Sequence, residues 1–145
     1  MSRIRITGGE WRSRLIKVNP SVKTLRPTPD RVRVTLFNWL GQDLTGLFCL
    51  DLFAGSGVLG FEAASRGAAL VTLIEQDQDA FGVLRQNAQA LGGEHLELIR
   101  MDAVKFAAST AQRYDLIFLD PPTFSNSTPS PGFSPIWLRS DLSSW

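Results

Sequence analysis

The chain has 145 residues, of which 43% are hydrophobic and 20% charged, a composition that fits one globular domain and excludes a disordered or fibrous chain. No apolar run approaches the ~20 residues that span a bilayer, and residues 1–14 lack the apolar centre of a signal peptide, so we expect a cytoplasmic protein without membrane contact. One cysteine, Cys49, excludes an internal disulfide, and with one histidine, His95, a zinc or iron site is not expected. Cys49 lies in an apolar run and is predicted to be buried.

The net charge of +1 conceals an uneven distribution of charge along the chain. Residues 1–33 contain nine Lys and Arg residues and two acidic ones, a net charge of +7, whereas residues 34–145 carry −6. A basic segment on a mildly acidic body is typical of a protein that binds a polyanion. The alternative is a basic segment that forms only a solvated edge of the surface.

A short β-hairpin is the first predicted element, in residues 3–18. Apolar and basic residues alternate between Arg3 and Ile6, Gly8-Gly9 supplies a turn, and a second strand runs to Val18. This alternation places basic side chains on one face of the hairpin. The residues predicted to bind phosphates, in this arm and the segment after it, are Arg3, Arg5, Arg12, Arg14, Arg26, Arg31 and Arg33.

A helix is predicted next, from about Thr28 to Leu40. Thr28 can cap its first turn, Pro29 suits the first helical position, and Asp30 favours the positive end of the helix dipole. Gly41 ends it. The expected apolar stripe comprises Val32, Leu36 and Trp39 or Leu40.

From Leu47 onward the chain repeats a strand, a turn and a helix. The predicted strands are residues 48–53, 69–74, 96–100 and 114–119, and the predicted helices follow Gly60 to about Ser65, follow Asp77 or Asp79 to Leu91, and cover residues 103–110. Near-continuous apolar strands that alternate with helices are typical of a parallel sheet covered on both faces. We therefore predict an α/β fold whose four parallel strands, numbered along the chain, have the order 3-2-1-4.

A glycine motif gives the most specific local pattern, in the segment from Asp51 to Gly60 (DLFAGSGVLG). It contains G-x-G-x-x-G between a predicted strand and a predicted helix, where Gly55 and Gly57 permit close approach of a ligand. Glu75 ends the next strand, 18 residues after Gly57, where a carboxylate can accept both hydroxyls of a ribose. The pattern predicts an adenosine-containing cofactor at the carboxyl ends of the strands; the alternative is a glycine turn used only for packing.

The charge of Asp51 bears on which cofactor binds. A carboxylate is badly placed beside the pyrophosphate of NAD but well placed, directly or through water, beside the cationic methionine moiety of S-adenosylmethionine. Asp102 and the backbone N–H of Ala103 are candidate partners of the adenine amino group, although Asp102 is equally well explained as a helix cap. An NAD-dependent oxidoreductase is the rival prediction, and it gives the basic arm no purpose.

The tripeptide Asp120-Pro121-Pro122 follows the fourth predicted strand. A carboxylate and a backbone carbonyl that accept both N–H bonds of an exocyclic amine would draw its nitrogen toward tetrahedral geometry and free its lone pair to attack a sulfonium methyl group. Two prolines stiffen the turn and leave carbonyls without a competing local N–H. These residues are our catalytic candidates; the alternative is an ordinary turn after a strand.

The chain resembles the RsmD-type 16S rRNA guanine-N2 methyltransferases. The matching segments are residues 5–14, 26–33, 35–40, 51–57 and 120–122. The first two are specific to that family, whereas the last two occur more widely in S-adenosylmethionine enzymes and amino-methyltransferases. The resemblance covers residues 1–122 and implies a Rossmann-like core that binds S-adenosylmethionine and methylates one guanine amine of 16S rRNA, in the small subunit or an assembly intermediate. We expect a monomer.

Residues 123–145 depart from the family pattern. Thr123 stands where the family has an aromatic residue, so Phe124 becomes the candidate for stacking on an extruded base. The segment holds seven Ser and three Pro, and no strand or helix is predicted in it. We therefore expect an arm (1–28), a core (29–122) and an atypical tail (123–145). The core would have an incomplete C-terminal half, with its fourth strand at the sheet edge. We expect its activity to be impaired. A non-catalytic RNA-binding chain and a DNA adenine methyltransferase are the further alternatives.

Overall fold

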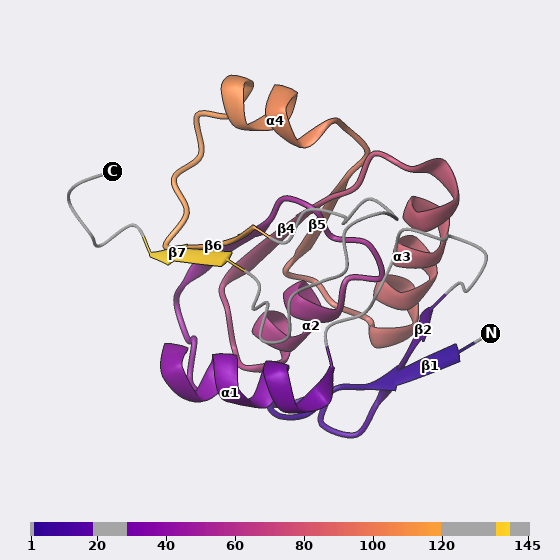
Figure 1. The fold of residues 1–145 in the computed structure, drawn as a ribbon, viewed down its shortest axis with the longest axis vertical. Coiled ribbons are helices and arrows are strands. Elements are labelled where there is room, and N and C mark those ends of the chain that lie inside the picture. The colour runs from indigo at the N-terminus through magenta and orange to yellow at the C-terminus, as the bar shows by residue number, and fades with distance from the viewer. Residues whose placement is uncertain (1, 19–28, 120–135, 140–145) are drawn as a thin grey trace, which may run out of the picture.

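Alternating strands and helices build the chain into an α/β structure (Figure 1). The computed structural model describes residues 2–18, 29–119 and 136–139. The strands are β1 (Ser2–Arg5), β2 (Leu15–Val18), β3 (Phe48–Asp51), β4 (Leu70–Ile74), β5 (Leu96–Ile99), β6 (Leu116–Leu119) and β7 (Ile136–Arg139). The helices are α1 (Asp30–Leu40), α2 (Val58–Ser65), α3 (Gln78–Leu91) and α4 (Ala103–Ser109). Within these ranges no helix is both long and apolar enough to cross a membrane.

The main sheet has the strand order β5-β4-β3-β6-β7. Strands β5, β4, β3 and β6 are mutually parallel. They correspond to the third, second, first and fourth of the predicted parallel strands, so the predicted order 3-2-1-4 is confirmed. β7 is antiparallel to β6, with Leu116 opposite Arg139 and Leu119 opposite Ile136. The expectation that residues 123–145 hold no strand, and that β6 lies at the edge, is therefore wrong. A strand of four residues, three of them apolar, is enough to pair with β6 and cover its backbone N–H and C=O groups, although the surrounding sequence is rich in serine and proline.

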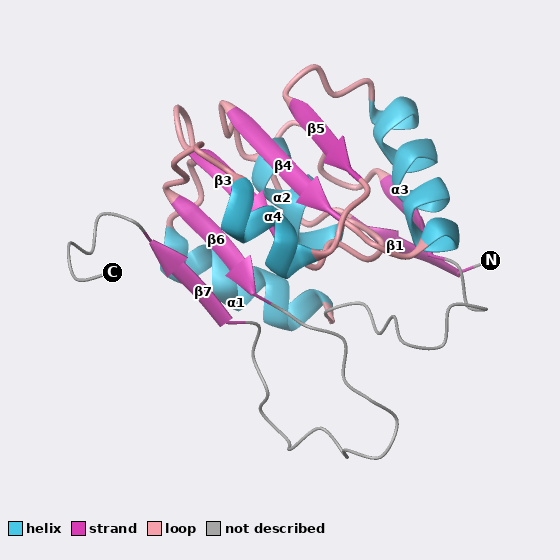
Figure 2. Cartoon of the chain, turned by 90° about the horizontal axis from the view of Figure 1, so that it is seen from above, coloured by secondary structure: helices cyan, strands magenta, loops and turns pink. Residues whose placement is uncertain are grey.

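Buried side chains form a separate cluster on each face of the sheet. The larger cluster packs α1, α2, α3 and the hairpin against one face, through strand residues Cys49, Val71, Leu73, Leu116 and Phe118. The smaller cluster packs Ala103 and Phe106 of α4 against the other face, with Leu50 and Ile74 from the strands. Figure 2 shows α4 alone on its side of the sheet. The alternation of neighbours such as Cys49 and Leu50 is the period-two pattern of a strand that is buried on both faces.

The N-terminal hairpin is packed into the larger cluster. β1 and β2 are antiparallel, as predicted, and Ile4 lies opposite Ile16 in their register. Ile6, Trp11 and Ile16 are buried in the same cluster as α1, α2 and α3. The apolar face of the hairpin therefore shares one hydrophobic core with the predicted core domain, and its polar face points outward.

Helix α1 buries Leu36 and Leu40 of the predicted stripe, so Leu40 rather than Trp39 completes it. Leu36, Phe37 and Leu40 are buried, but Trp39 is 73% exposed. The buried side of the helix is completed by Arg33, a residue that a hydrophobic pattern does not select. Trp39 lies on the exposed side of the helix.

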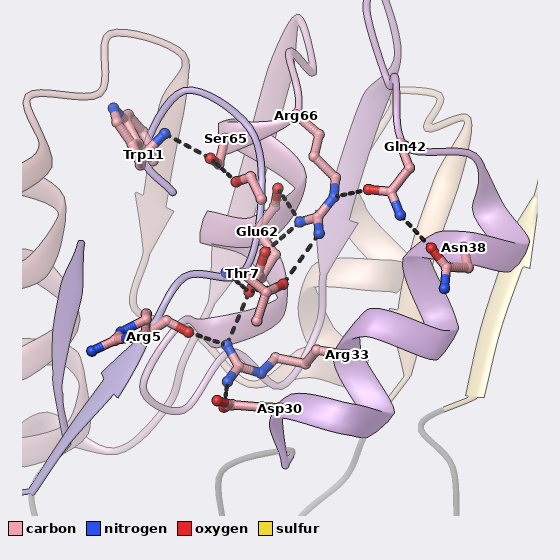
Figure 3. Close-up of polar contacts among 11 residues, drawn as sticks. Arg5, Thr7, Trp11, Asp30, Arg33, Asn38, Gln42, Glu62, Ser65 and Arg66 are labelled. Carbon is pink, nitrogen blue, oxygen red and sulfur yellow. Dashed lines mark hydrogen bonds and ion pairs between the residues drawn. The ribbon is translucent and has the colours of Figure 1, made fainter. Parts of the chain in front are cut away.

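Glu62 of α2 explains why Arg33 is buried (Figure 3). Its side chain is fully buried and pairs with Arg33 at 2.9 Å and with Arg66. Glu62 also accepts hydrogen bonds from the backbone N–H of Thr7 at 2.8 Å and from its hydroxyl at 2.9 Å. Arg33 in turn donates to the carbonyl of Arg5 at 2.9 Å. One carboxylate therefore connects the hairpin, α1 and α2.

Cys49 is completely buried in β3, as expected for a cysteine that acts as a small hydrophobe. Burial, and after it the negative charge of Asp115, raises the pKa of the Cys49 thiol to about 12. The thiol is therefore protonated at neutral pH, which is unfavourable for a nucleophile.

Removing the carboxylate of Glu62 tests whether it holds these elements together. Glu62→Ala would leave the guanidinium groups of Arg33 and Arg66 without their shared buried anion, so we expect a loss of about 3–5 kcal/mol in the free energy of unfolding. Urea denaturation measures this loss. Glu97→Ala, which removes an exposed carboxylate, is the control and should change stability by less than about 0.5 kcal/mol. Equal stability of the two variants would contradict a central role for Glu62.

Candidate cofactor site and basic surface

The candidate cofactor residues lie at one edge of the sheet. Because β3, β4, β5 and β6 are parallel, their carboxyl ends share that edge. Asp51 ends β3, Glu75 follows β4, and Asp102 begins the turn into α4 shortly after β5. β6 ends at the same edge with Leu119, the residue before Asp120 in the sequence. The catalytic candidates Asp120, Pro121 and Pro122 and the stacking candidate Phe124 lie outside the described residues.

The glycine loop between β3 and α2 depends on two left-handed residues. Gly55 has φ +57° and Gly57 has φ +88°, a conformation that side chains disfavour. The N–H of Gly57 donates to the carbonyl of Ala54 at 2.8 Å, which closes the turn. A Cβ atom on Gly57 would lie 2.4 Å from the ring of Phe61 and 2.6 Å from Leu84. The second glycine of the motif is therefore required for packing beneath the loop as well as for its backbone conformation.

Glu75 shapes the same loop. One of its carboxylate oxygens accepts the N–H of Gly55 at 2.8 Å, and the other accepts the N–H of Asp77 at 2.9 Å. Each carboxylate oxygen has two lone pairs, so both can accept a further hydrogen bond from a ligand hydroxyl. Its half-buried position at the carboxyl end of β4 is consistent with the predicted contact to a ribose, which stays a prediction.

Asp51 is buried, with 1% of its surface exposed. A carboxylate in a low-dielectric position exerts a strong field on a nearby charge, which favours a cation and disfavours an anion at this edge. This agrees with the sequence argument for a cationic ligand group. Because so little of Asp51 is exposed, its effect on a bound ligand would be electrostatic or mediated by water.

Asp102 caps α4. Its side chain accepts the N–H of Lys105 at 3.0 Å, so the helix-cap alternative is confirmed. Ala103 is the first residue of this helix and is buried, and the N–H groups of a first helical turn lack intrahelical acceptors. The predicted contacts of Asp102 and Ala103 with an adenine amino group stay predictions.

The outer face of the hairpin carries a concentrated positive charge. Arg3 and Arg5 of β1 and Lys17 of β2 are exposed, and Arg3 lies directly opposite Lys17. Like charges in directly opposite positions destabilise a strand pair. A surface that keeps them together suits the phosphates of a polyanion. Lys17 was not among the predicted phosphate-binding residues, although its position opposite Arg3 in a hairpin could have identified it.

The remaining arginine candidates fall into different environments. Arg12, Arg14 and Arg31 are exposed, and Arg14 donates a hydrogen bond of 2.7 Å to the carbonyl of Ala90 near the end of α3. Arg33 is 0% exposed and is held by Glu62 and Asp30, so its prediction as a phosphate-binding residue is wrong. Arg26 lies outside the described residues.

The hydrogen-bonding and charged groups at the sheet edge fit a nucleoside that carries a positive charge. Glu75 offers acceptors for hydroxyl groups, and the first turn of α4 offers N–H donors for ring nitrogens. Asp51 and Glu75 bring negative charge to the edge. This charge would repel a pyrophosphate and attract a cationic group.

Comparison with known proteins relates the whole described core to one family. A family model described as "Conserved hypothetical protein 95" matches residues 4–130. "Ribosomal RNA small subunit methyltransferase D" of Escherichia coli K12 is 46% identical over 119 residues, covering 82% of this chain and 60% of that protein. The protein of the same name from Haemophilus influenzae Rd is 44% identical over 127 residues, covering 85% of this chain and 65% of that protein.

A solved structure supports the same relationship. "Putative methyltransferase yhhF from Escherichia coli" has a TM-score of 0.75 and 42% sequence identity, and the alignment covers 83% of this chain and 65% of that chain. The chain thus spans 60–65% of the length of these relatives.

Two glycine substitutions test whether Gly57 is required for packing beneath the loop. Gly57→Ala places a methyl group against Phe61 and Leu84 and imposes an unfavourable φ, so we expect a loss of about 1–3 kcal/mol in the free energy of unfolding. Gly82→Ala, in α3, has no atom within 4 Å of the new Cβ and should gain up to about 1 kcal/mol. Urea denaturation compares both with the wild type, and a Gly57→Ala variant of unchanged stability would show that the loop relaxes freely.

Proposed function

Because the chain belongs to the family described as Conserved hypothetical protein 95, as its resemblance to the RsmD-type enzymes predicted, we propose that it transfers a methyl group from S-adenosylmethionine to the N2 amine of a guanine in 16S rRNA. The observation that carries the proposal is the sheet edge, where the glycine loop, Asp51, Glu75 and the end of β6 meet. The names of the two bacterial relatives, which refer to the small ribosomal subunit, support the choice of RNA.

Residues at the sheet edge account for recognition of the cofactor. Glu75 accepts the ribose hydroxyls, the first turn of α4 at Asp102 and Ala103 contacts the adenine, and the field of Asp51 stabilises the cationic methionine moiety. Gly55 and Gly57 let the backbone approach it closely. When bound, S-adenosylmethionine supplies a methyl group activated by its sulfonium.

The Asp120-Pro121-Pro122 segment orients the target amine in this proposal. The Asp120 carboxylate and the Pro121 carbonyl accept the two N–H bonds of the guanine amine, and Pro122 stiffens the turn. Held in this way, the nitrogen would have its lone pair free for the methyl group that S-adenosylmethionine would supply. Transfer would form a nitrogen–carbon bond at the expense of the sulfur–carbon bond, leave S-adenosylhomocysteine, and release one proton from the nitrogen. Phe124 is our candidate for stacking on the extruded base.

The hairpin supplies the RNA contacts. Arg3, Arg5 and Lys17 project from one face, and Arg12, Arg14, Arg26 and Arg31 extend the proposed phosphate-binding set. These contacts position the RNA without reading its sequence. Because the hairpin shares its core with α2 and α3, which pack beneath the glycine loop, phosphates bound on the arm lie in a fixed relation to the cofactor edge.

Substitution of Asp120 tests the catalytic proposal. Asp120→Ala removes one of the two acceptors that orient the amine, so we expect methyl transfer to 16S rRNA to fall by about 100-fold or more, with the affinity for S-adenosylhomocysteine retained. Transfer of a labelled methyl group measures the first quantity and calorimetry the second. Asp79→Ala, an exposed carboxylate in the first turn of α3, is the matched control and should keep wild-type activity.

The same experiment separates the alternatives. Salt-dependent RNA binding without methyl transfer by the wild type would support a non-catalytic RNA-binding chain. Calorimetric binding of NADH in preference to S-adenosylhomocysteine would support an oxidoreductase, and methylation of DNA adenine in place of RNA would redirect the substrate.

The salt dependence of RNA binding tests the arm. Arg3→Ala and Lys17→Ala should each reduce the slope of the logarithm of affinity against the logarithm of salt concentration by about 0.7–0.9, because each removes one phosphate contact. Fluorescence anisotropy with labelled 16S rRNA fragments measures the slopes. Arg113→Ala, an exposed cation at the opposite end of the sheet, should leave the slope unchanged. Equal slopes for all three variants would place the RNA elsewhere.

A further inference from the structure

Asn87 of α3 lies between the hairpin and the glycine loop. Its side chain is buried, with 4% of the residue exposed. Its Oδ1 accepts the N–H of Lys17 at 2.9 Å, and its Nδ2 donates to the carbonyl of Lys17 at 2.9 Å. The same Nδ2 also donates to the carbonyl of Ser56 at 3.4 Å. One amide therefore contacts the backbone of β2 and the backbone of the glycine loop.

The two residues that Asn87 contacts belong to the two proposed binding surfaces. Lys17 carries one of the cations on the outer face of the hairpin, directly opposite Arg3. Ser56 stands between Gly55 and Gly57, the two left-handed residues of the loop. A buried polar side chain that satisfies both backbones transmits a displacement of one to the other, because a lost hydrogen bond at this depth is costly.

The three residues at the centre of the loop are held by contacts from different side chains. The N–H of Gly55 is held by Glu75, and Gly57 packs on Phe61 and Leu84. The carbonyl of Ser56 is contacted by Asn87. Of these contacts, only the one from Asn87 leads to the hairpin.

We propose that Asn87 is a positioning residue that couples RNA binding on the hairpin to cofactor binding at the glycine loop, so that each ligand raises the affinity for the other. This inference rests on the proposed function. The contact to Ser56, at 3.4 Å, is longer than an ordinary hydrogen bond, so closure of the loop on a cofactor can shorten and strengthen it. RNA phosphates that fix Lys17 fix the amide of Asn87 as well, which favours the shortened contact. Linkage requires the effect to be reciprocal.

Glu62 offers a second connection between the hairpin and α2, and it differs in kind. Its hydrogen bonds to Thr7 reach the segment that follows β1, and its ion pair with Arg33 joins α1 to α2. None of these contacts touches the three central loop residues. A variant of Glu62 is therefore expected to change stability, whereas a variant of Asn87 is expected to change the coupling.

The experiment measures binding of S-adenosylhomocysteine to the full chain by calorimetry, with and without saturating 16S rRNA at one salt concentration. This ligand lacks the sulfonium charge, so direct attraction between cofactor and RNA does not imitate coupling. For the wild type we expect RNA to lower the dissociation constant by about fivefold or more. For Asn87→Ala the ratio should fall toward one, while Gln86→Ala, the exposed neighbour on α3, should keep the wild-type ratio.

A second variant covers the case in which Asn87→Ala fails to fold. Asn87→Asp keeps the volume and can still accept the N–H of Lys17, but it cannot donate to the carbonyls of Lys17 and Ser56, so the ratio should again approach one. A wild-type ratio of one, with both ligands bound, overturns the coupling and leaves the proposed function standing. A wild-type ratio retained in a folded Asn87 variant also overturns the role of Asn87. Failure of the wild type to bind either ligand overturns both proposals.

Discussion

The buried carboxylate of Glu62 is the interaction on which the arrangement of the N-terminal half depends. It lies between two arginines and a threonine that come from three different segments, and all of them are buried or half-buried. Such a cluster is costly to desolvate, and its value lies in allowing one geometry only, since any displacement leaves a charge uncompensated. Because Glu62 belongs to the helix that starts at the glycine loop, this geometry also fixes where the hairpin lies relative to the cofactor edge.

The two surfaces that the proposed reaction needs are therefore built on one rigid core. The proposed cofactor edge is formed by the ends of parallel strands, a location that any sheet of this topology provides. The cationic face belongs to a hairpin whose opposite face is apolar and buried with α2 and α3. A methyltransferase that acts on a large RNA must hold a flexible polyanion so that one nitrogen is aligned with one methyl carbon. A cationic surface that packs directly on the proposed cofactor-binding layer sets this alignment through few intervening contacts.

Local patterns predicted most of the fold, and long-range pairing accounts for what they missed. The parallel strands, the glycine loop and the cap of α3 at Asp77 follow from apolar runs and short-range chemistry, and the structure confirms them. Arg33 looked like a surface cation because its partner Glu62 is 29 residues away in the sequence, and no pattern within α1 reveals that pair. The apolar pattern of α1 left Trp39 and Leu40 as alternatives, and the structure buries Leu40. Strand β7 was missed because its apolar run is short and surrounded by serine and proline.

The hydrogen bond from Thr7 to Glu62 joins residues 55 positions apart, and this separation has a consequence for synthesis of the chain. Translation proceeds from the N-terminus at about 5–20 residues per second, so the cationic segment leaves the ribosome several seconds before the helix that anchors it. During that interval its isoleucines and its tryptophan have no core to enter, and its arginines face a particle made largely of RNA. The nascent protein is thus most exposed to nonspecific binding by nucleic acid while it is still on the ribosome, before α2 has emerged.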